Sequence, residues 1–264
     1  MRYSAQLNMV RYVFTSQGRG FPLVMLHGFT GSELNWQMAA YTDQFEVIAP
    51  DLLGHGETES PIHANRYHIK AAARDIIALC DSLRLEKINL LGYSMGGRLA
   101  LYLAVNYPER VHKLILESAS PGLKTQAERD ERRQRDEALA ERIESEGIEA
   151  FVRYWESLPL WDSQTEAMKA QLRAIRLRHN PIGLANSLRG MGTGAQPSMW
   201  EFLPQLKMPV LLIAGALDEK FTTINQQMHT ILPQSRLEVI PDAGHTVHLE
   251  KPNQFEKLVL EFLR

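Results

Sequence analysis

The chain has 264 residues, of which 44% are hydrophobic and 23% are charged, a composition typical of a soluble globular protein with a large core. Its formal net charge of −2 at pH 7 excludes a general attraction to nucleic acid or to an anionic membrane surface. We therefore expect a protein that binds neither nucleic acid nor membrane. The single cysteine, Cys80, cannot form an internal disulfide, and the first residues contain no apolar signal-like run, so we expect the protein to be cytoplasmic.

The first 120 residues alternate between predicted strands and helices. Residues 2–15 alternate loosely and predict an antiparallel pair of strands. Near-continuous apolar runs predict buried strands at Pro22–Leu26, Phe45–Ala49, Ile88–Leu91 and Val111–Leu116. Apolar spacing predicts helices at His68–Leu83 and Met95–Tyr107. This order favours a parallel sheet with helices on both faces.

The pattern changes after residue 120. Residues 121–204 are strongly charged in their first part, are interrupted by prolines and contain no strand-like run. We expect them to form a helical cap inserted into an α/β core made of residues 1–120 and 205–264. The core resumes with predicted strands and a closing helix at Val210–Ala214, Arg236–Ile240 and Asn253–Leu263.

A nucleophile-elbow pattern lies between a predicted strand and a predicted helix. Gly92, Ser94 and Gly96 form the sequence Gly-x-Ser-x-Gly. A sharp turn from strand to helix strains the residue at the bend, and glycines beside it avoid collisions with neighbouring backbone. The pattern therefore predicts a serine hydroxyl held at the carboxyl edge of the sheet, next to the positive end of a helix.

A serine hydroxyl needs a base to take its proton and a third group to orient that base. We assign the base to His245 and the acid to Asp218, since each follows a predicted strand and the chain order is Ser, acid, His. Taken singly, Asp218 could be a helix N-cap and His245 a loop histidine. Glu117 also ends a strand and is the rival for the acid.

Two backbone N–H groups are needed to stabilise a developing oxyanion. We assign them to Met95, which starts the elbow helix, and to Phe29, in the loop after the first buried strand. His27, beside that loop, is expected to be a structural hydrogen-bonding residue. The other histidines lack the spacing of metal ligands, so we expect no metal site.

Arg98 lies one helical turn after Ser94, on the same face of the predicted helix. Two roles are open for its guanidinium. It could form a buried ion pair with Glu117 or another carboxylate, or it could bind a carboxylate of the substrate in bidentate fashion.

The chain resembles the α/β-hydrolase superfamily throughout and, within it, the 2-succinyl-6-hydroxy-2,4-cyclohexadiene-1-carboxylate synthases of menaquinone biosynthesis. Superfamily-wide segments are the elbow and Ala243-Gly244-His245. Segments 27–31 and 194–197 also match. The more specific matches are Arg98 after the elbow, the Pro-Gly-Leu segment within 120–123, and the segment 218–221.

The resemblance implies a lyase that eliminates pyruvate from a cyclohexene tricarboxylate without a cofactor. It places substrate-binding arginines at Arg98, Arg132 and Arg176, and pocket residues at Tyr93 and Trp155. Because other arginines surround Arg132, the match could be displaced by one helical turn.

Two other functions remain open. A hydrolase of carboxylated esters, thioesters or C–C bonds would use the same serine, histidine and oxyanion loop. A non-catalytic binding module on a hydrolase fold is the second, although an intact triad argues against it. The sequence leaves the oligomeric state open.

Overall fold

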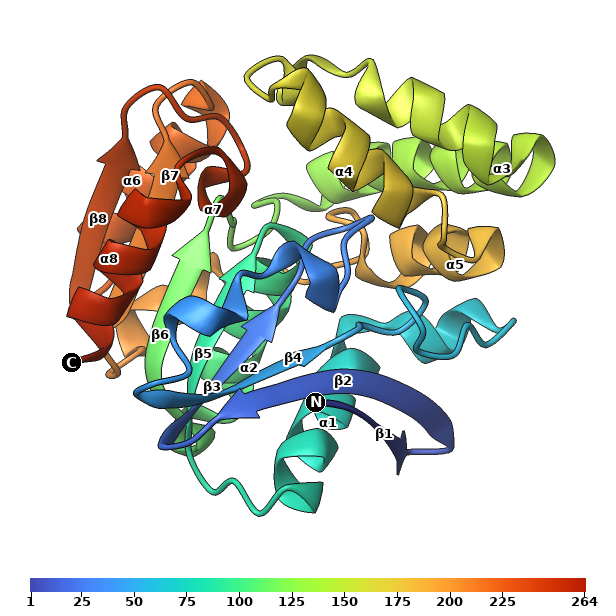
Figure 1. The fold of residues 1–264 in the computed structure, drawn as a ribbon. Helices are drawn as coiled ribbons and strands as arrows, with labels where there is room; N and C mark the ends of the chain where they lie inside the picture. Colours follow the sequence, from blue (N-terminus) through green and yellow to red (C-terminus); the bar gives the residue numbers. More distant parts are fainter.

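One eight-stranded sheet forms the centre of the protein in the computed structural model, which describes residues 1–264 (Figure 1). The strands are β1 (Arg2–Leu7), β2 (Val10–Gly18), β3 (Phe21–Leu26), β4 (Phe45–Pro50), β5 (Ile88–Tyr93), β6 (Val111–Glu117), β7 (Val210–Gly215) and β8 (Ser235–Ile240). Their order is β1-β2-β4-β3-β5-β6-β7-β8. The pairs β1–β2 and β2–β4 are antiparallel, and all the others are parallel, which confirms the predicted mostly parallel sheet.

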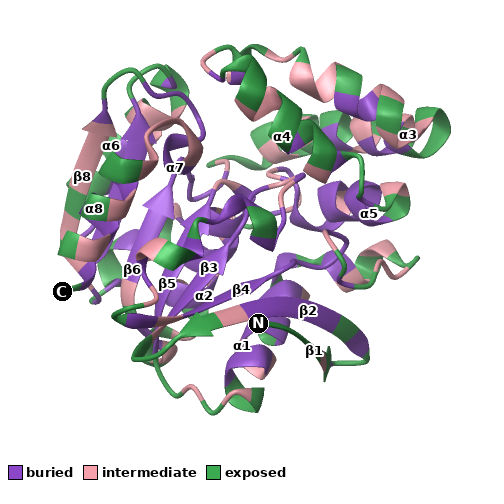
Figure 2. Ribbon diagram, viewed as in Figure 1, coloured by how far each residue is buried: buried purple, intermediate pink, exposed green.

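Helices cover both faces of the sheet. The α-helices of the core are α1 (Ile69–Ser82), α2 (Met95–Asn106), α6 (Glu219–Ile231), α7 (Val247–Glu250) and α8 (Pro252–Leu263). Residues of α1, α2 and α6 pack with one face of the sheet, and residues of α7 and α8 pack with the other. Since successive side chains of a strand point to opposite faces, Leu23 and Met25 of β3 enter one core and Val24 and Leu26 the other. This two-sided burial explains the continuous apolar runs of the central strands, which Figure 2 shows as buried.

Three further helices lie beyond the carboxyl ends of the parallel strands (Figure 1). They are α3 (Gln126–Glu156), α4 (Glu166–Arg176) and α5 (Pro181–Met191). Thr125 begins α3 with a reciprocal capping box to Glu128. Within α3, Gly147 has φ 80° and ψ 174°, so the helix consists of two segments that meet at a kink. Side chains of α3 and α5 form a small separate core, which includes Phe151 and Leu184.

Short 3₁₀ helices connect these elements. They are η1 (Glu33–Asn35), η2 (Met38–Ala40), η3 (Ala64–Tyr67), η4 (Pro108–Arg110), η5 (Pro159–Trp161) and η6 (Trp200–Gln205). The sequence did not predict α6, which begins directly after Asp218 with that side chain as its N-cap. No helix of the structure is both long and apolar enough to cross a membrane.

Candidate active site

The turn from β5 into α2 carries Ser94 at its tip. Its backbone has φ 50° and ψ −109°, a conformation that non-glycine residues seldom adopt. A Cβ at Gly92 would lie 2.4 Å from the oxygen of Gly96, and a Cβ at Gly96 would lie 2.1 Å from the oxygen of Leu26. Only glycine fits at both positions, which is the physical basis of the elbow motif.

Ser94, His245 and Asp218 form one chain of hydrogen bonds. Nε2 of His245 lies 3.0 Å from Oγ of Ser94, and its Nδ1 lies 2.6 Å from Oδ2 of Asp218. Because a carboxylate only accepts, Nδ1 carries the hydrogen and Nε2 is left free to accept the proton of the serine. His245 and Asp218 are buried, so this tautomer is held away from water.

Glu117, the rival for the acid, lies in a second pair. Its carboxylate accepts hydrogen bonds from the backbone N–H of His248 and from Nδ1 of the same residue, both at 2.9 Å. The Tyr93 ring contacts both histidines: its centroid lies 5.4 Å from that of His245 and 4.8 Å from that of His248. In the structure Asp218, and not Glu117, contacts His245.

The two N–H groups assigned to the oxyanion site are both available. Met95 is the first residue of α2, so its N–H has no acceptor within the helix. The N–H of Phe29 donates no hydrogen bond to any other group of the chain. Both residues line the same cavity as Ser94.

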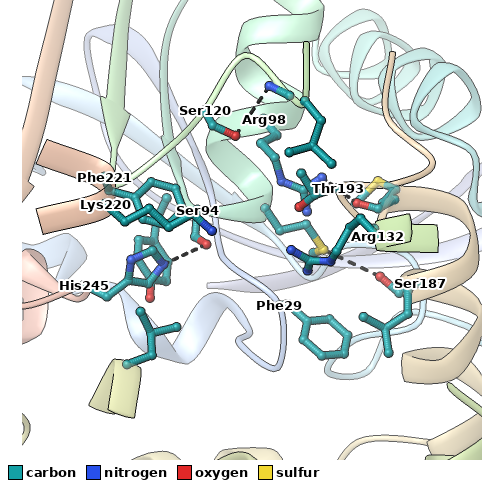
Figure 3. A pocket seen from close by; sticks show the side chains of 18 of the residues that line it. Phe29, Ser94, Arg98, Ser120, Arg132, Ser187, Thr193, Lys220, Phe221 and His245 are labelled. Atoms are coloured by element: carbon teal, nitrogen blue, oxygen red, sulfur yellow. Dashed lines mark hydrogen bonds between the residues drawn. The ribbon is translucent and has the colours of Figure 1, made fainter. Parts of the chain in front are cut away.

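That cavity has a volume of about 250 Å³ and lies between the sheet edge and the helices α3 and α5 (Figure 3). Its lining includes the predicted nucleophile and oxyanion residues, which are Ser94, Phe29 and Met95. It also includes Tyr93, Trp155 and His245. Its three cationic side chains are Arg98, Arg132 and Lys220. In Figure 3 Lys220 lies on the side of Ser94 and His245, across from the two arginines.

Arg98 has no carboxylate partner. Its Nη1 donates to the backbone oxygen of Met191 at 2.7 Å and to the side-chain oxygen of Gln196 at 2.9 Å. Burial, followed by repulsion from Arg132, lowers the pKa of Arg98 to about 10, so it remains protonated at neutral pH. The ion pair with Glu117 that was open from the sequence is not formed.

Arg132 is the arginine of its cluster that lines the cavity. Its Nε donates to Asp136 at 2.8 Å, one turn further along α3, and the side chain is 39% exposed. The neighbouring arginines make other contacts: Arg129 with Leu123, Arg133 with Gly194, and Arg135 with Glu131.

Arg176 is not among the residues that line the cavity. It is buried, and its guanidinium lies 5.2 Å from the centroid of the indole ring of Trp161, a residue that does line the cavity. Its Nη1 donates to Glu156 at 3.1 Å, while Nε has no hydrogen-bond partner. The indole nitrogens of Trp155 and Trp161 are also buried without acceptors. Several donors therefore lack partners at this end of the site.

Lys220 and Trp161 line the cavity and were not singled out from the sequence. Lys220 forms no salt bridge. Its Nζ lies 5.6 Å from the centroid of the Phe221 ring. Its signal was the segment Asp218-Glu219-Lys220-Phe221, in which Lys220 follows the acid by two residues. No group of three His, Cys, Asp or Glu side chains is arranged to hold a metal ion.

Comparison with known proteins identifies the family of this chain. The family model described as "alpha/beta hydrolase fold" matches residues 22–252. A Bacillus subtilis relative, named provisionally as a 2-succinyl-6-hydroxy-2,4-cyclohexadiene-1-carboxylate synthase, is 50% identical over 96% of this chain and 95% of its own length.

Two solved structures are similar over nearly the whole chain. MenH from S. aureus is 39% identical, with a TM-score of 0.90 and coverage of 96% of this chain and 97% of its own. A thermophilic esterase from Thermogutta terrifontis, with malate bound, is 29% identical, with a TM-score of 0.87 and coverage of 100% and 98%. This chain belongs to the α/β-hydrolase family and, within it, to the 2-succinyl-6-hydroxy-2,4-cyclohexadiene-1-carboxylate synthases.

Proposed function

We propose that this protein is a lyase of menaquinone biosynthesis that eliminates pyruvate from 2-succinyl-5-enolpyruvyl-6-hydroxy-3-cyclohexene-1-carboxylate. One observation carries the proposal. Arg98 and Lys220, which have no carboxylate partners, share a cavity with a hydrogen-bonded Ser94 and His245. A substrate with three carboxylates supplies the anions that these side chains lack.

In the reaction that we derive, Ser94 is the base. Its proton passes to Nε2 of His245, and the alkoxide removes the ring proton next to the succinyl carbonyl. The electron pair of the broken C–H bond moves onto the carbonyl oxygen, which the N–H groups of Phe29 and Met95 stabilise. When the carbonyl re-forms, the ring double bond shifts and the enolpyruvyl C–O bond breaks. His245 then returns its proton to the departing enolpyruvate, which becomes pyruvate, so the step balances without a cofactor.

The carboxylates are divided between two ends of the site in this proposal. Arg98 and Arg132 bind at one end. Arg176, with Tyr93 and Trp155, binds at the other, where the donors of Arg176 and Trp155 are unpaired. Because Trp161, which contacts the Arg176 guanidinium, lines the cavity and Arg176 does not, we propose that substrate contact with Arg176 requires a shift of that indole. Residues 121–204 act as the cap that closes over the substrate.

The direct test is incubation of the protein with the cyclohexene tricarboxylate while pyruvate is measured through lactate dehydrogenase and NADH. We expect pyruvate to form with the wild type, and the Ser94→Ala variant to serve as the control that does not form it. Absence of pyruvate with an active, folded wild type would overturn the proposal.

A second function is hydrolysis of carboxylated esters. The 3.0 Å contact between Ser94 and His245 suits attack on a carbonyl as well as proton removal, and the malate-bound esterase is a similar protein. The ordered hydrogen-bond chain of Ser94, His245 and Asp218 argues against a non-catalytic binding module.

A further inference from the structure

The loop that carries Phe29 is held by its carbonyl groups. The oxygen of Gly28 accepts hydrogen bonds from Nδ1 of His27 at 2.8 Å and from the N–H of Gly31 at 3.0 Å. The peptide bond between Gly28 and Phe29 is planar and trans, so its oxygen and its N–H point in opposite directions. Fixing the oxygen of Gly28 therefore fixes the direction of the Phe29 N–H.

The peptide group between Thr30 and Gly31 is hydrogen-bonded to a residue from a distant part of the chain. The oxygen of Thr30 accepts a hydrogen bond from Nε2 of His179 at 2.9 Å. The N–H of the same peptide unit is that of Gly31, which donates to Gly28. Thr30 has φ 64°, a strained conformation that needs such support. His179 thus acts on the orientation of Phe29 through two consecutive hydrogen bonds.

The protonation state of His179 follows from its partners. A carbonyl can only accept, so Nε2 donates to Thr30, and Nδ1 accepts the N–H of Gly56 at 3.0 Å. The imidazole is therefore neutral and uses both nitrogens. Burial lowers its pKa to about 4, which keeps it in this form.

His179 also connects the loop to the proposed substrate-binding end. It lies in the sequence between α4 and α5, and its backbone N–H donates to the backbone oxygen of Arg176 at 3.3 Å. We propose that His179 is a positioning residue of the reaction: from the helical segment it holds the Thr30 carbonyl, so that the Phe29 N–H faces the developing oxyanion. This inference rests on the oxyanion role proposed for Phe29.

Three substitutions separate this role from simple support of the fold. The amide of glutamine reaches the place of Nε2, so His179→Gln retains a donor for Thr30. The shorter His179→Asn reaches only the place of Nδ1 and retains an acceptor for Gly56. His179→Phe keeps the ring volume and removes both contacts.

We expect His179→Asn and His179→Phe to lower kcat at least about tenfold with a smaller change in KM, because a misdirected oxyanion donor weakens the transition state. His179→Gln should stay within about threefold of the wild type, although it loses the bond from Gly56. The matched control is Asn186→Ala. That residue is buried, its side-chain amide donates to the oxygens of Pro61 and Ile62, and it forms no hydrogen bond with the Phe29 loop. It should lower Tm and leave kcat unchanged.

A second readout does not depend on the natural substrate. An alkyl fluorophosphonate reacts with the serine: an Oγ–P bond forms, fluoride leaves, His245 takes the serine proton, and the phosphoryl oxygen occupies the oxyanion site. We expect the inactivation rate to fall about tenfold in His179→Asn and to be retained in His179→Gln. If pyruvate were never formed but these rates still separated, the proposed function would fail and the role of His179 would stand. Equal inactivation rates in all four proteins, with Tm alone changed, would overturn the inference.

Discussion

Nη1 of Arg98 lies 2.9 Å from the side-chain oxygen of Gln196, a partner without charge. The only other acceptor of this guanidinium is the backbone oxygen of Met191. A half-buried cation held by neutral oxygens still has its full charge available to a ligand, and its desolvation stabilises nothing in the free protein. Binding of a carboxylate would supply the missing counter-charge.

The Arg98→Ala variant tests this role. Removal of a cation paired with a substrate carboxylate costs about 2–4 kcal/mol, so kcat/KM should fall by roughly two powers of ten or more. Tm should fall only by the loss of the two hydrogen bonds to Met191 and Gln196, because no ion pair is lost. Steady-state kinetics and a thermal melt measure both. A clear fall in Tm with kcat/KM preserved would instead assign Arg98 a structural role.

The two remaining arginines are tested against neighbours of the same type. Arg132→Ala should lower kcat/KM by about two powers of ten, whereas Arg135→Ala, on the same helix but in an exposed pair with Glu131, should not. Arg176→Ala should also lower kcat/KM by about two powers of ten, whereas Arg173→Ala should not. Both arginines pair with Glu156, but Arg173 is exposed. Equal effects within either pair would remove that arginine from the substrate site.

The strands and the elbow were predictable because their signals are local. A run such as Leu23–Leu26 is apolar at every position only when both faces are covered, and the glycines around Ser94 follow from close backbone approach. The position of Arg176 was not predictable. Its sequence spacing says nothing of the indole of Trp161, which its guanidinium contacts and which lines the cavity in its place. Helix α6 has few apolar residues, but Phe221, Ile224, Met228 and Ile231 recur at helical spacing, so its sequence does carry a helix signal.

Ser94, His245 and Asp218 should act as a unit. Removal of any one should lower kcat by several powers of ten, and the double variant Ser94→Ala, His245→Ala should be little worse than either single variant. Asp218→Asn should abolish activity, because His245 loses the partner that fixes its tautomer. Glu117→Gln should mainly lower Tm, since it weakens a buried pair with His248. If Glu117→Gln abolished turnover and Asp218→Asn did not, the acid would be wrongly assigned.

Stability should fall on the acid side of neutrality because of buried histidines whose pKa values burial lowers, namely His27, His55 and His179. Burial lowers the pKa of His27 and of His179 to about 4. In the unfolded chain each titrates near 6.5, so as pH falls below about 6.5 the unfolded state takes up protons first and stability is lost until about pH 4. Each of His27 and His179 can account for roughly 3 kcal/mol over that window.

Urea unfolding at pH 7.5 and pH 5 measures this loss. In His179→Gln, which lacks the titrating group, the difference between the two pH values should be smaller than in the wild type by about 2 kcal/mol. The comparison cancels buried carboxyls away from His179, such as Glu33, whose pKa is raised by burial and whose effect on stability has the opposite sign. An identical difference in both proteins would show that His179 is not buried in the neutral form.

The last prediction concerns what Ser94 does. In ester hydrolysis its Oγ would form a covalent acyl-enzyme, whereas in elimination it only carries a proton between substrate and His245. The tricarboxylate has no acyl leaving group, so we expect mass spectrometry of rapidly quenched enzyme to find only the unmodified mass of Ser94 peptides during turnover. If removal of the ring proton is reversible, substrate recovered from deuterated solvent should carry deuterium at that ring carbon. An adduct on Ser94 that forms and decays at the turnover rate would replace the base mechanism with nucleophilic catalysis.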